Sequence, residues 1–89
     1  MERKEKVTKV FDGDTFLTNR RKYPVRLEGI NTPEKTHPNY KKAKQELQEL
    51  IMDKEISIER VARDKYKRTV AKVKIGNQSV NKIMEKYQK

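Results

Sequence analysis

The stretch that decides the fold runs from Val7 to Leu17 and has the sequence VTKVFDGDTFL. Two short apolar runs in this stretch flank a turn at Asp12-Gly13-Asp14, an arrangement that is typical of a tight hairpin. We therefore predict a β-hairpin over residues 6–18. The turn also places two carboxylates close to each other in the sequence.

A third strand and a helix are predicted after the hairpin. Apolar and polar residues alternate from Tyr23 to Ile30, with Tyr23 and Leu27 on one face and Ile30 on the other, as in a β-strand. The segment 31–38 contains two prolines, which interrupt a strand ladder, so it is predicted to be a loop. From about residue 39 to residue 52 apolar side chains recur at helical spacing, which predicts an amphipathic helix.

Two further strands and a short helix are predicted in the second half of the chain. Ile56 and Ile58 alternate with polar residues, and a similar alternation covers residues 71–75, which predicts two strands. An apolar stripe at helical spacing covers residues 80–87 and follows Ser79, a residue type that is favoured at helix N-caps. A short helix is therefore expected near the end of the chain.

The order of these elements indicates the fold class. Three strands, a helix, two strands and a helix form the order of a five-stranded Greek-key barrel of the OB-fold type, with a helix after the third strand. We therefore predict an α+β fold, mainly β, with a short C-terminal helix. No linker or internal repeat divides the sequence, so residues 1–89 are predicted to form a single domain.

Composition limits the core and indicates the partner. The 89 residues are 40% charged and 33% hydrophobic and include no cysteine, so a small core must stabilise the fold without disulfides. The formal net charge of +10 favours nucleic acid as the partner. No apolar run reaches the ~18 residues of a membrane span, so no membrane partner is expected. No apolar segment follows the charged start, which predicts a cytoplasmic protein, and a secreted protein is the alternative if a leader has been removed.

Two acid-rich turns interrupt this basic chain. One is Asp12-Gly13-Asp14 and the other is Asn31-Thr32-Pro33-Glu34, and both carry side-chain oxygens that suit a hard cation. Because Ca²⁺ takes about six to eight oxygen ligands, two neighbouring loops of this kind are able to share one ion. The alternative is that each is an ordinary turn without a ligand.

The basic residues concentrate between residues 60 and 74. This segment holds seven lysines and arginines and the single acid Asp64, with Tyr66 in its middle. Cations along the phosphates and a ring for a nucleotide are what a strand of nucleic acid requires, and a solvated β-hairpin is the alternative. Arg26 lies apart from this segment, between two apolar residues, and its planar guanidinium suits bidentate contact with a phosphate.

Three motifs occur in order around the predicted helix. They are VFDGDT at residues 10–15, VRLEGINTPE at residues 25–34 and DKYKR at residues 64–68. Together they resemble the staphylococcal (thermonuclease-like) nuclease family. The resemblance implies a nuclease that cleaves the P–O5′ bonds of DNA or RNA with little sequence preference and leaves 3′-phosphates.

The resemblance also implies a calcium site. In this family one Ca²⁺ is held by residues that match Asp14, Asn31 and the carbonyl of Thr32. Asn31 stands where the family usually has an aspartate, so the site loses one negative charge. Since ligand charge controls Ca²⁺ affinity, we expect weaker Ca²⁺ binding than in the family pattern.

Three residues match the catalytic positions of the family. Arg26 and Arg68 match the pair that binds the scissile phosphate and stabilises the charge that gathers on it. Glu34 matches the general base that takes a proton from the attacking water. The resemblance therefore implies that two cations and one carboxylate act on the same phosphate.

The DKYKR motif matches the nucleotide-binding loop of the family with one departure. Lys65 and Tyr66 match positions that contact a terminal phosphate, and Lys67 replaces the usual glycine and adds a cation. If this position has a positive φ, lysine costs about 1 kcal/mol there. The sequence stops at Lys89, whereas the family normally continues through a further helix, so a short form is expected. Its oligomeric state stays open.

The sequence thus predicts a calcium-dependent nuclease, and two other hypotheses stay open. One is a non-catalytic nucleic-acid-binding OB-fold module, and the other is a basic module that interacts with ribosomes or proteins. A pure binding module has no use for carboxylates that repel phosphate. The presence of Asp14 and Glu34 in a basic chain therefore favours catalysis.

Overall fold

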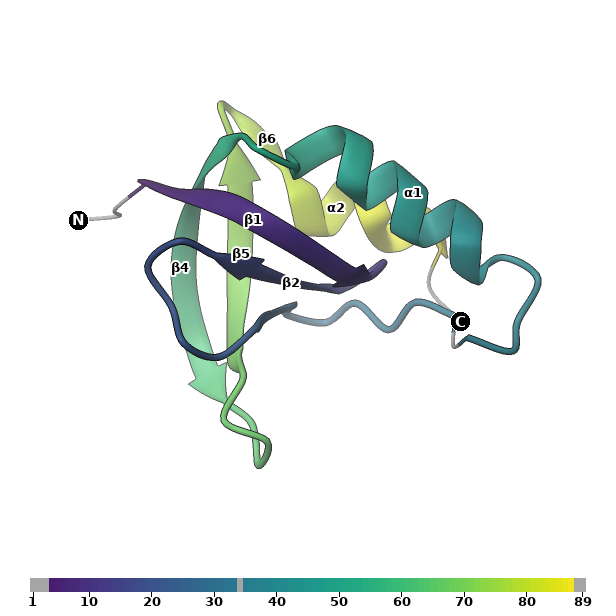
Figure 1. The fold of residues 1–89 in the computed structure, drawn as a ribbon, viewed down its shortest axis with the longest axis horizontal. Coiled ribbons are helices and arrows are strands. Elements are labelled where there is room, and N and C mark those ends of the chain that lie inside the picture. The colour runs from purple at the N-terminus through teal and green to yellow at the C-terminus, as the bar shows by residue number, and fades with distance from the viewer. Residues whose placement is uncertain (1–3, 34, 88–89) are drawn as a thin grey trace.

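The computed structural model describes residues 4–33 and 35–87 (Figure 1). In chain order the elements are β1 (Lys4–Asp12), β2 (Thr15–Thr18), β3 (Val25–Leu27), α1 (Tyr40–Ile51), β4 (Glu55–Arg63), β5 (Thr69–Ile75), β6 (Gln78–Ser79), α2 (Val80–Met84) and the 3₁₀ turn η1 (Glu85–Tyr87). The predicted hairpin and both predicted helices are confirmed. Within the described part of the chain, neither helix has the length and apolar character needed to cross a membrane.

Five of the strands close into a ring. The sheet has the order β3-β2-β1-β4-β5-β6 with antiparallel neighbours, and β3 also pairs with β5 in parallel. In this parallel pairing Val25 lies opposite Thr69 and Leu27 lies opposite Ala71. The ring and the two helices confirm the predicted α+β fold of the OB type. The short strand β6 was not predicted, because two residues are too few to show an alternation.

A small apolar core joins the ring to both helices. It is built from strand side chains and from one face of each helix, including Val7, Phe16, Val25, Leu27, Leu47, Ile51, Ile56, Val73, Val80 and Met84. Figure 1 shows α1 and α2 on the same side of the strands. At the start of α2 the hydroxyl of Ser79 accepts a hydrogen bond of 3.2 Å from the backbone N–H of Lys82, which confirms the predicted cap.

The third strand is shorter than predicted. β3 spans only Val25–Leu27, because the chain turns directly after it. Gly29 has a φ of 75°, in the left-handed region that glycine tolerates best, and the N–H of Ile30 donates to the carbonyl of Leu27 at 3.3 Å. As a result Ile30 turns into the core, whereas Tyr23 is 39% exposed. The predicted extent from Tyr23 to Ile30 was therefore wrong at both ends.

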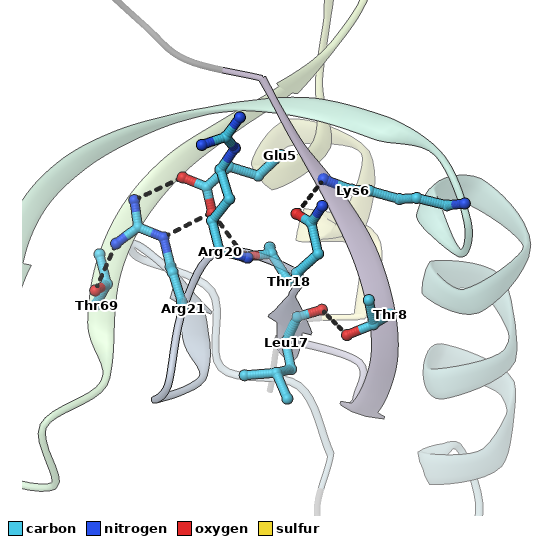
Figure 2. A network of polar contacts seen from close by, with 9 residues as sticks. Glu5, Lys6, Thr8, Leu17, Thr18, Arg20, Arg21 and Thr69 are labelled. Carbon is cyan, nitrogen blue, oxygen red and sulfur yellow. Dashed lines mark hydrogen bonds and ion pairs between the residues drawn. The ribbon is translucent and has the colours of Figure 1, made fainter.

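A buried carboxylate ties the strands together at one end of the ring (Figure 2). Glu5 of β1 accepts a hydrogen bond of 2.7 Å from the hydroxyl of Thr18. Arg21 donates to both carboxylate oxygens of Glu5, at 2.9 and 3.0 Å, and its Nη1 donates to Oγ1 of Thr69 at 3.2 Å. Bidentate, charge-assisted hydrogen bonds of this kind offset the desolvation of a buried carboxylate. The network fixes the β2–β3 loop against β1 and β5.

Asn81 ties α2 to the ring at another place. Its Oδ1 accepts a hydrogen bond of 2.9 Å from the N–H of Val73. Its Nδ2 donates to the carbonyls of Glu28, at 2.9 Å, and Ala71, at 3.2 Å. One side chain therefore links α2, β5 and the turn that follows β3, and so helps to place the loop that carries Asn31 and Thr32.

Candidate active site

The turn between β1 and β2 lies close to α1 and to the loop after β3. A Cβ atom on Gly13 would meet the Cβ of Ala43 at 2.8 Å and the Oγ1 of Thr32 at 3.0 Å. The φ of Gly13 is not in the left-handed region, so its backbone conformation does not require glycine. The close approach requires it, because a Cβ atom would be too near Ala43. The approach brings the acidic turn against the second acid-rich segment, so the two loops are neighbours, as sharing one ion would require.

The carboxylate of Asp14 is buried and held from three sides. Its Oδ1 accepts a hydrogen bond of 2.9 Å from the hydroxyl of Thr15. Its Oδ2 accepts one of 3.2 Å from the backbone N–H of Thr32, and Nη2 of Arg26 lies 3.6 Å from the same oxygen. Asp14 therefore links the turn, the β3 strand and the loop after it.

Arg26 projects from β3 next to both predicted metal-ligand side chains. It pairs with Thr15 across the β2–β3 ladder, which places its side chain beside Asp14. Its Nη2 also donates to Oδ1 of Asn31 at 3.5 Å. The guanidinium is thus oriented by a carboxylate and an amide, and about a quarter of the side chain is exposed at 26%.

Arg68 is oriented by a second carboxylate, in the β4–β5 loop. Its Nε donates to Oδ2 of Asp64 at 2.7 Å, and Oδ1 of Asp64 accepts from the backbone N–H groups of Tyr66 and Arg68. Partial burial raises the pKa of Asp64, but the hydrogen bonds from Arg68 and Tyr66 outweigh it and lower the pKa below its usual value. Asp64 is therefore a positioning residue that stays ionised beside Arg68.

These residues meet in one open cleft of about 310 Å³. Its lining consists of Asp12, Asp14, Arg26, Asn31, Thr32, Pro33, Lys35 and Arg68. The cleft thus brings together the three residues predicted to hold a metal and the two predicted arginines. The predicted general base Glu34 lies outside the described residues.

Three residues of this lining, Asp12, Pro33 and Lys35, were not predicted as site residues. Asp12 belongs to the same turn as Asp14, so its place in the motif was the available signal. Near it, the hydroxyl of Tyr40 donates to the carbonyl of Phe11 at 3.1 Å. Burial and the neighbouring Asp12 carboxylate raise the pKa of Tyr40. Lys35 had no signal beyond its position next to the second acid-rich turn.

The oxygen donors of the cleft are of the kinds that a hard cation takes. Asp12 and Asp14 supply carboxylates, and Asn31 supplies an amide oxygen that lies near the same Arg26 nitrogen as Asp14. Over residues 4–33 and 35–87, no group of three or more His, Cys, Asp or Glu side chains gathers as a metal site. Because charge count sets Ca²⁺ affinity, two carboxylates and one amide would make at most a weak Ca²⁺ site.

The loop residues predicted to contact nucleotide separate into two groups. Tyr66 is 65% exposed, and Nζ of Lys65 and the guanidinium carbon of Arg68 lie 5.2 and 5.4 Å from its ring centroid. Lys67 has a φ of 67°, and its Nζ lies 5.6 Å from the ring centroid of Tyr23 instead. The position thus has the positive φ at which lysine costs about 1 kcal/mol, and Lys67 contacts a different ring from Lys65.

A ring of strands with a cleft that joins two oriented arginines to an acidic turn defines an OB-like domain with a polar cleft. Residues 24–87 match the family model of the staphylococcal nuclease homologues, and the chain belongs to this family.

Two relatives show how much of a longer protein this chain resembles. It is 38% identical over 84 residues to a protein of Haemophilus influenzae named "Uncharacterized endonuclease". This match covers 91% of this chain and 47% of that protein. It is 36% identical over 66 residues to an "Uncharacterized 38.1 kDa protein" of Capnoides sempervirens, which covers 74% of this chain and 20% of the relative. The chain therefore spans about half the length of the first relative and a fifth of the second.

Proposed function

We propose that the protein is a nuclease that hydrolyses phosphodiester bonds of DNA or RNA. The observation that carries this proposal is the cleft in which Arg26 and Arg68, each oriented by its own carboxylate, lie beside the acidic turn. Membership of the staphylococcal nuclease homologues and the name of the Haemophilus influenzae relative support it. Carboxylates repel a bound phosphate, so their presence in the cleft of a basic chain favours catalysis over binding alone.

The two arginines are proposed to bind the scissile phosphate. Arg26 is held by Asp14 and Asn31, and Arg68 is held by Asp64, so both guanidinium groups are positioned before the substrate arrives. Guanidinium groups match phosphate oxygens in geometry, and they stabilise the negative charge that develops on those oxygens in the transition state.

Glu34 is proposed as the general base. It follows Thr32 by two residues in the sequence, and the backbone N–H of Thr32 is fixed by Asp14. A carboxylate takes a proton from a water molecule as the water oxygen bonds to phosphorus. The P–O5′ bond then breaks, its electron pair leaves with O5′, and O5′ takes a proton from solvent, which leaves a 3′-phosphate and a 5′-hydroxyl on the products.

Calcium is the proposed cofactor. Asp14, Asn31 and the carbonyl of Thr32 would hold it, with Asp12 at the same cleft. When bound, such a cation would neutralise phosphate charge and polarise the P–O bonds. Since Asn31 is neutral, we expect activity to require more Ca²⁺ than it would with an aspartate there.

One observation favours the alternative of a non-catalytic nucleic-acid-binding module. Nη2 of Arg26 lies within 3.6 Å of Asp14 Oδ2 and within 3.5 Å of Asn31 Oδ1. The guanidinium thus already neutralises the oxygens that a metal would use. In a binding module, this contact would keep the cleft attractive to phosphate without a metal.

Cleavage of a labelled single-stranded oligonucleotide distinguishes the two functions. The wild-type protein is assayed in millimolar Ca²⁺ and in EDTA, together with Glu34→Gln and the matched control Glu49→Gln, an exposed glutamate on α1. The nuclease predicts cleavage by the wild type and by the control in Ca²⁺ only, and at least about a 100-fold loss in Glu34→Gln. Binding without cleavage in millimolar Ca²⁺ would support the binding module instead.

A further inference from the structure

A second, basic pocket lies beside the β4–β5 loop. It has a volume of about 190 Å³ and is lined by Arg21, Lys22, Tyr23, Arg63, Lys67 and Thr69. These residues come from the β2–β3 loop, the end of β4 and the start of β5 with the loop before it. The lining contains four cations and no acidic residue. None of these residues lines the first cleft.

Three of the four cations around this pocket have no ion pair within residues 4–33 and 35–87. Arg21 is paired with Glu5, and its Nη1 donates to Thr69, so its side chain is held in place at the edge of the pocket. Within the described residues, Lys22, Arg63 and Lys67 make no ion pair with a carboxylate. Three like charges around so small a volume repel one another, and an anion between them would relieve that repulsion.

An aromatic ring holds two of these cations in place. Nζ of Lys22 and Nζ of Lys67 lie 5.9 and 5.6 Å from the ring centroid of Tyr23, within the range of cation–π attraction. Tyr23 itself is exposed at the rim. Both ammonium groups thus lie within about 6 Å of the centre of one ring.

The backbone of Lys67 supports the same interpretation. A φ of 67° is unfavourable for lysine, and such strained residues often occur at functional sites. The conformation is held by the hydrogen bond from the N–H of Lys67 to the carbonyl of Asp64, at 3.1 Å. It separates Lys67 from Lys65 and Tyr66 and brings its ammonium group to Tyr23.

We propose that this pocket binds a second backbone phosphate of a single-stranded nucleic acid, away from the bond that is cut. The proposal rests on the proposed function, because it takes nucleic acid as the occupant of the first cleft. The two sites are close along the chain: Lys67 precedes Arg68, and Tyr23 precedes Arg26 by three residues, which is at most about 10 Å of backbone. One strand is able to contact both, since OB folds bind about 4–16 nucleotides.

Binding of a fluorescent 12-nucleotide single-stranded DNA in EDTA tests the pocket without any cleavage. Fluorescence anisotropy gives the affinity of wild type and of the double variant Lys22→Gln/Lys67→Gly between 50 and 200 mM salt. Lys67→Gly suits this test because glycine adopts a positive φ readily. The matched control is Lys74→Gln, an exposed lysine on β5 that lies about 16 Å along the strand from Thr69.

Loss of one phosphate contact sets the expected result. The plot of log affinity against log salt should become shallower by about 0.7 in the double variant, which is about a five-fold loss of affinity at 0.1 M salt. Equal slopes for the double variant and Lys74→Gln would overturn the pocket, even if the wild type cleaves DNA in Ca²⁺. A shallower slope in the double variant together with no cleavage by the wild type would support the pocket and reject the nuclease.

Discussion

The substitution Gly13→Ala tests how the acidic turn is positioned, because two effects of opposite sign compete. Gly13 does not have a positive φ, so alanine suits its backbone. On that ground alone, alanine would stabilise the protein by about 0.4–1 kcal/mol through the unfolded chain. The new Cβ, however, would lie 2.8 Å from the Cβ of Ala43, an atom that α1 holds in place and that cannot rotate away.

The contact is expected to determine the sign. Overpacking of a well-packed site costs about 1–3 kcal/mol, so Gly13→Ala should destabilise the protein by a net ~1–2 kcal/mol. For a domain of this size, each 1 kcal/mol corresponds to about 4–8 °C in Tm. Cleavage should also fall in the folded variant, because the turn that carries Asp14 has to move away from Thr32.

Urea and thermal unfolding of four proteins measure this contact directly: wild type, Gly13→Ala, Ala43→Gly and the double variant. Ala43→Gly alone should cost about 1 kcal/mol of helix stability. In the double variant the contact with Ala43 is gone, so its loss should be smaller than the sum of the single losses by about 1 kcal/mol. A Gly13→Ala protein as stable as wild type, or strictly additive losses, would refute the close approach of the turn to α1.

Three further predictions concern the contacts that position the sites. Glu5→Gln should lower the free energy of unfolding, measured in urea, by about 2 kcal/mol. This is less than the cost of breaking a fully buried pair, because the side chain of Arg21 is 26% exposed. A change under about 0.5 kcal/mol would contradict the role of the network in Figure 2. Asn81→Asp should cost about 2 kcal/mol, because its Nδ2 donates to two carbonyls, whereas an equal Tm would contradict it. The lowered pKa of Asp64 adds stability that is present above its unfolded pKa of about 3.9 and is lost as pH falls through the folded value. Thermal unfolding from pH 7 to pH 2 should therefore decline less steeply below pH ~4 in Asp64→Asn, and identical profiles would exclude this contribution.

Most elements of the fold were predictable from local patterns. The hairpin, α1 and α2 follow from apolar spacing and from the turn and cap residues, which act over a few positions in the sequence. The extent of β3 was not predictable in this way. The alternation of apolar and polar residues continues through Gly29, although the chain turns there. The Glu5–Arg21 pair was not found either, since it joins residues 16 positions apart whose charges are common in this chain.

The candidate site was predictable where the motif fixed residue types, and less so where direction mattered. The sequence placed Asp14, Asn31 and Arg26 at one site, and the structure brings their side chains to one cleft. The sequence predicted that Lys65 and Lys67 act together. In the structure, the positive φ of Lys67 places its ammonium group near the ring of Tyr23, whereas Lys65 lies near the ring of Tyr66. The second pocket was not predicted, because its residues come from the β2–β3 loop, β4 and the start of β5. These segments meet only when the ring of strands closes, and no local pattern in the sequence shows that closure.

Cleavage kinetics of Arg68→Lys test the central claim most directly. Lysine keeps the charge but loses the planar fork that reaches a phosphate while it pairs with Asp64. The kcat/KM for Ca²⁺-dependent cleavage should fall at least about 100-fold, whereas Arg60→Lys, at an exposed arginine on β4, should retain wild-type activity. Equal kcat/KM values for Arg68→Lys and wild type would contradict the proposal that this cleft stabilises the reacting phosphate.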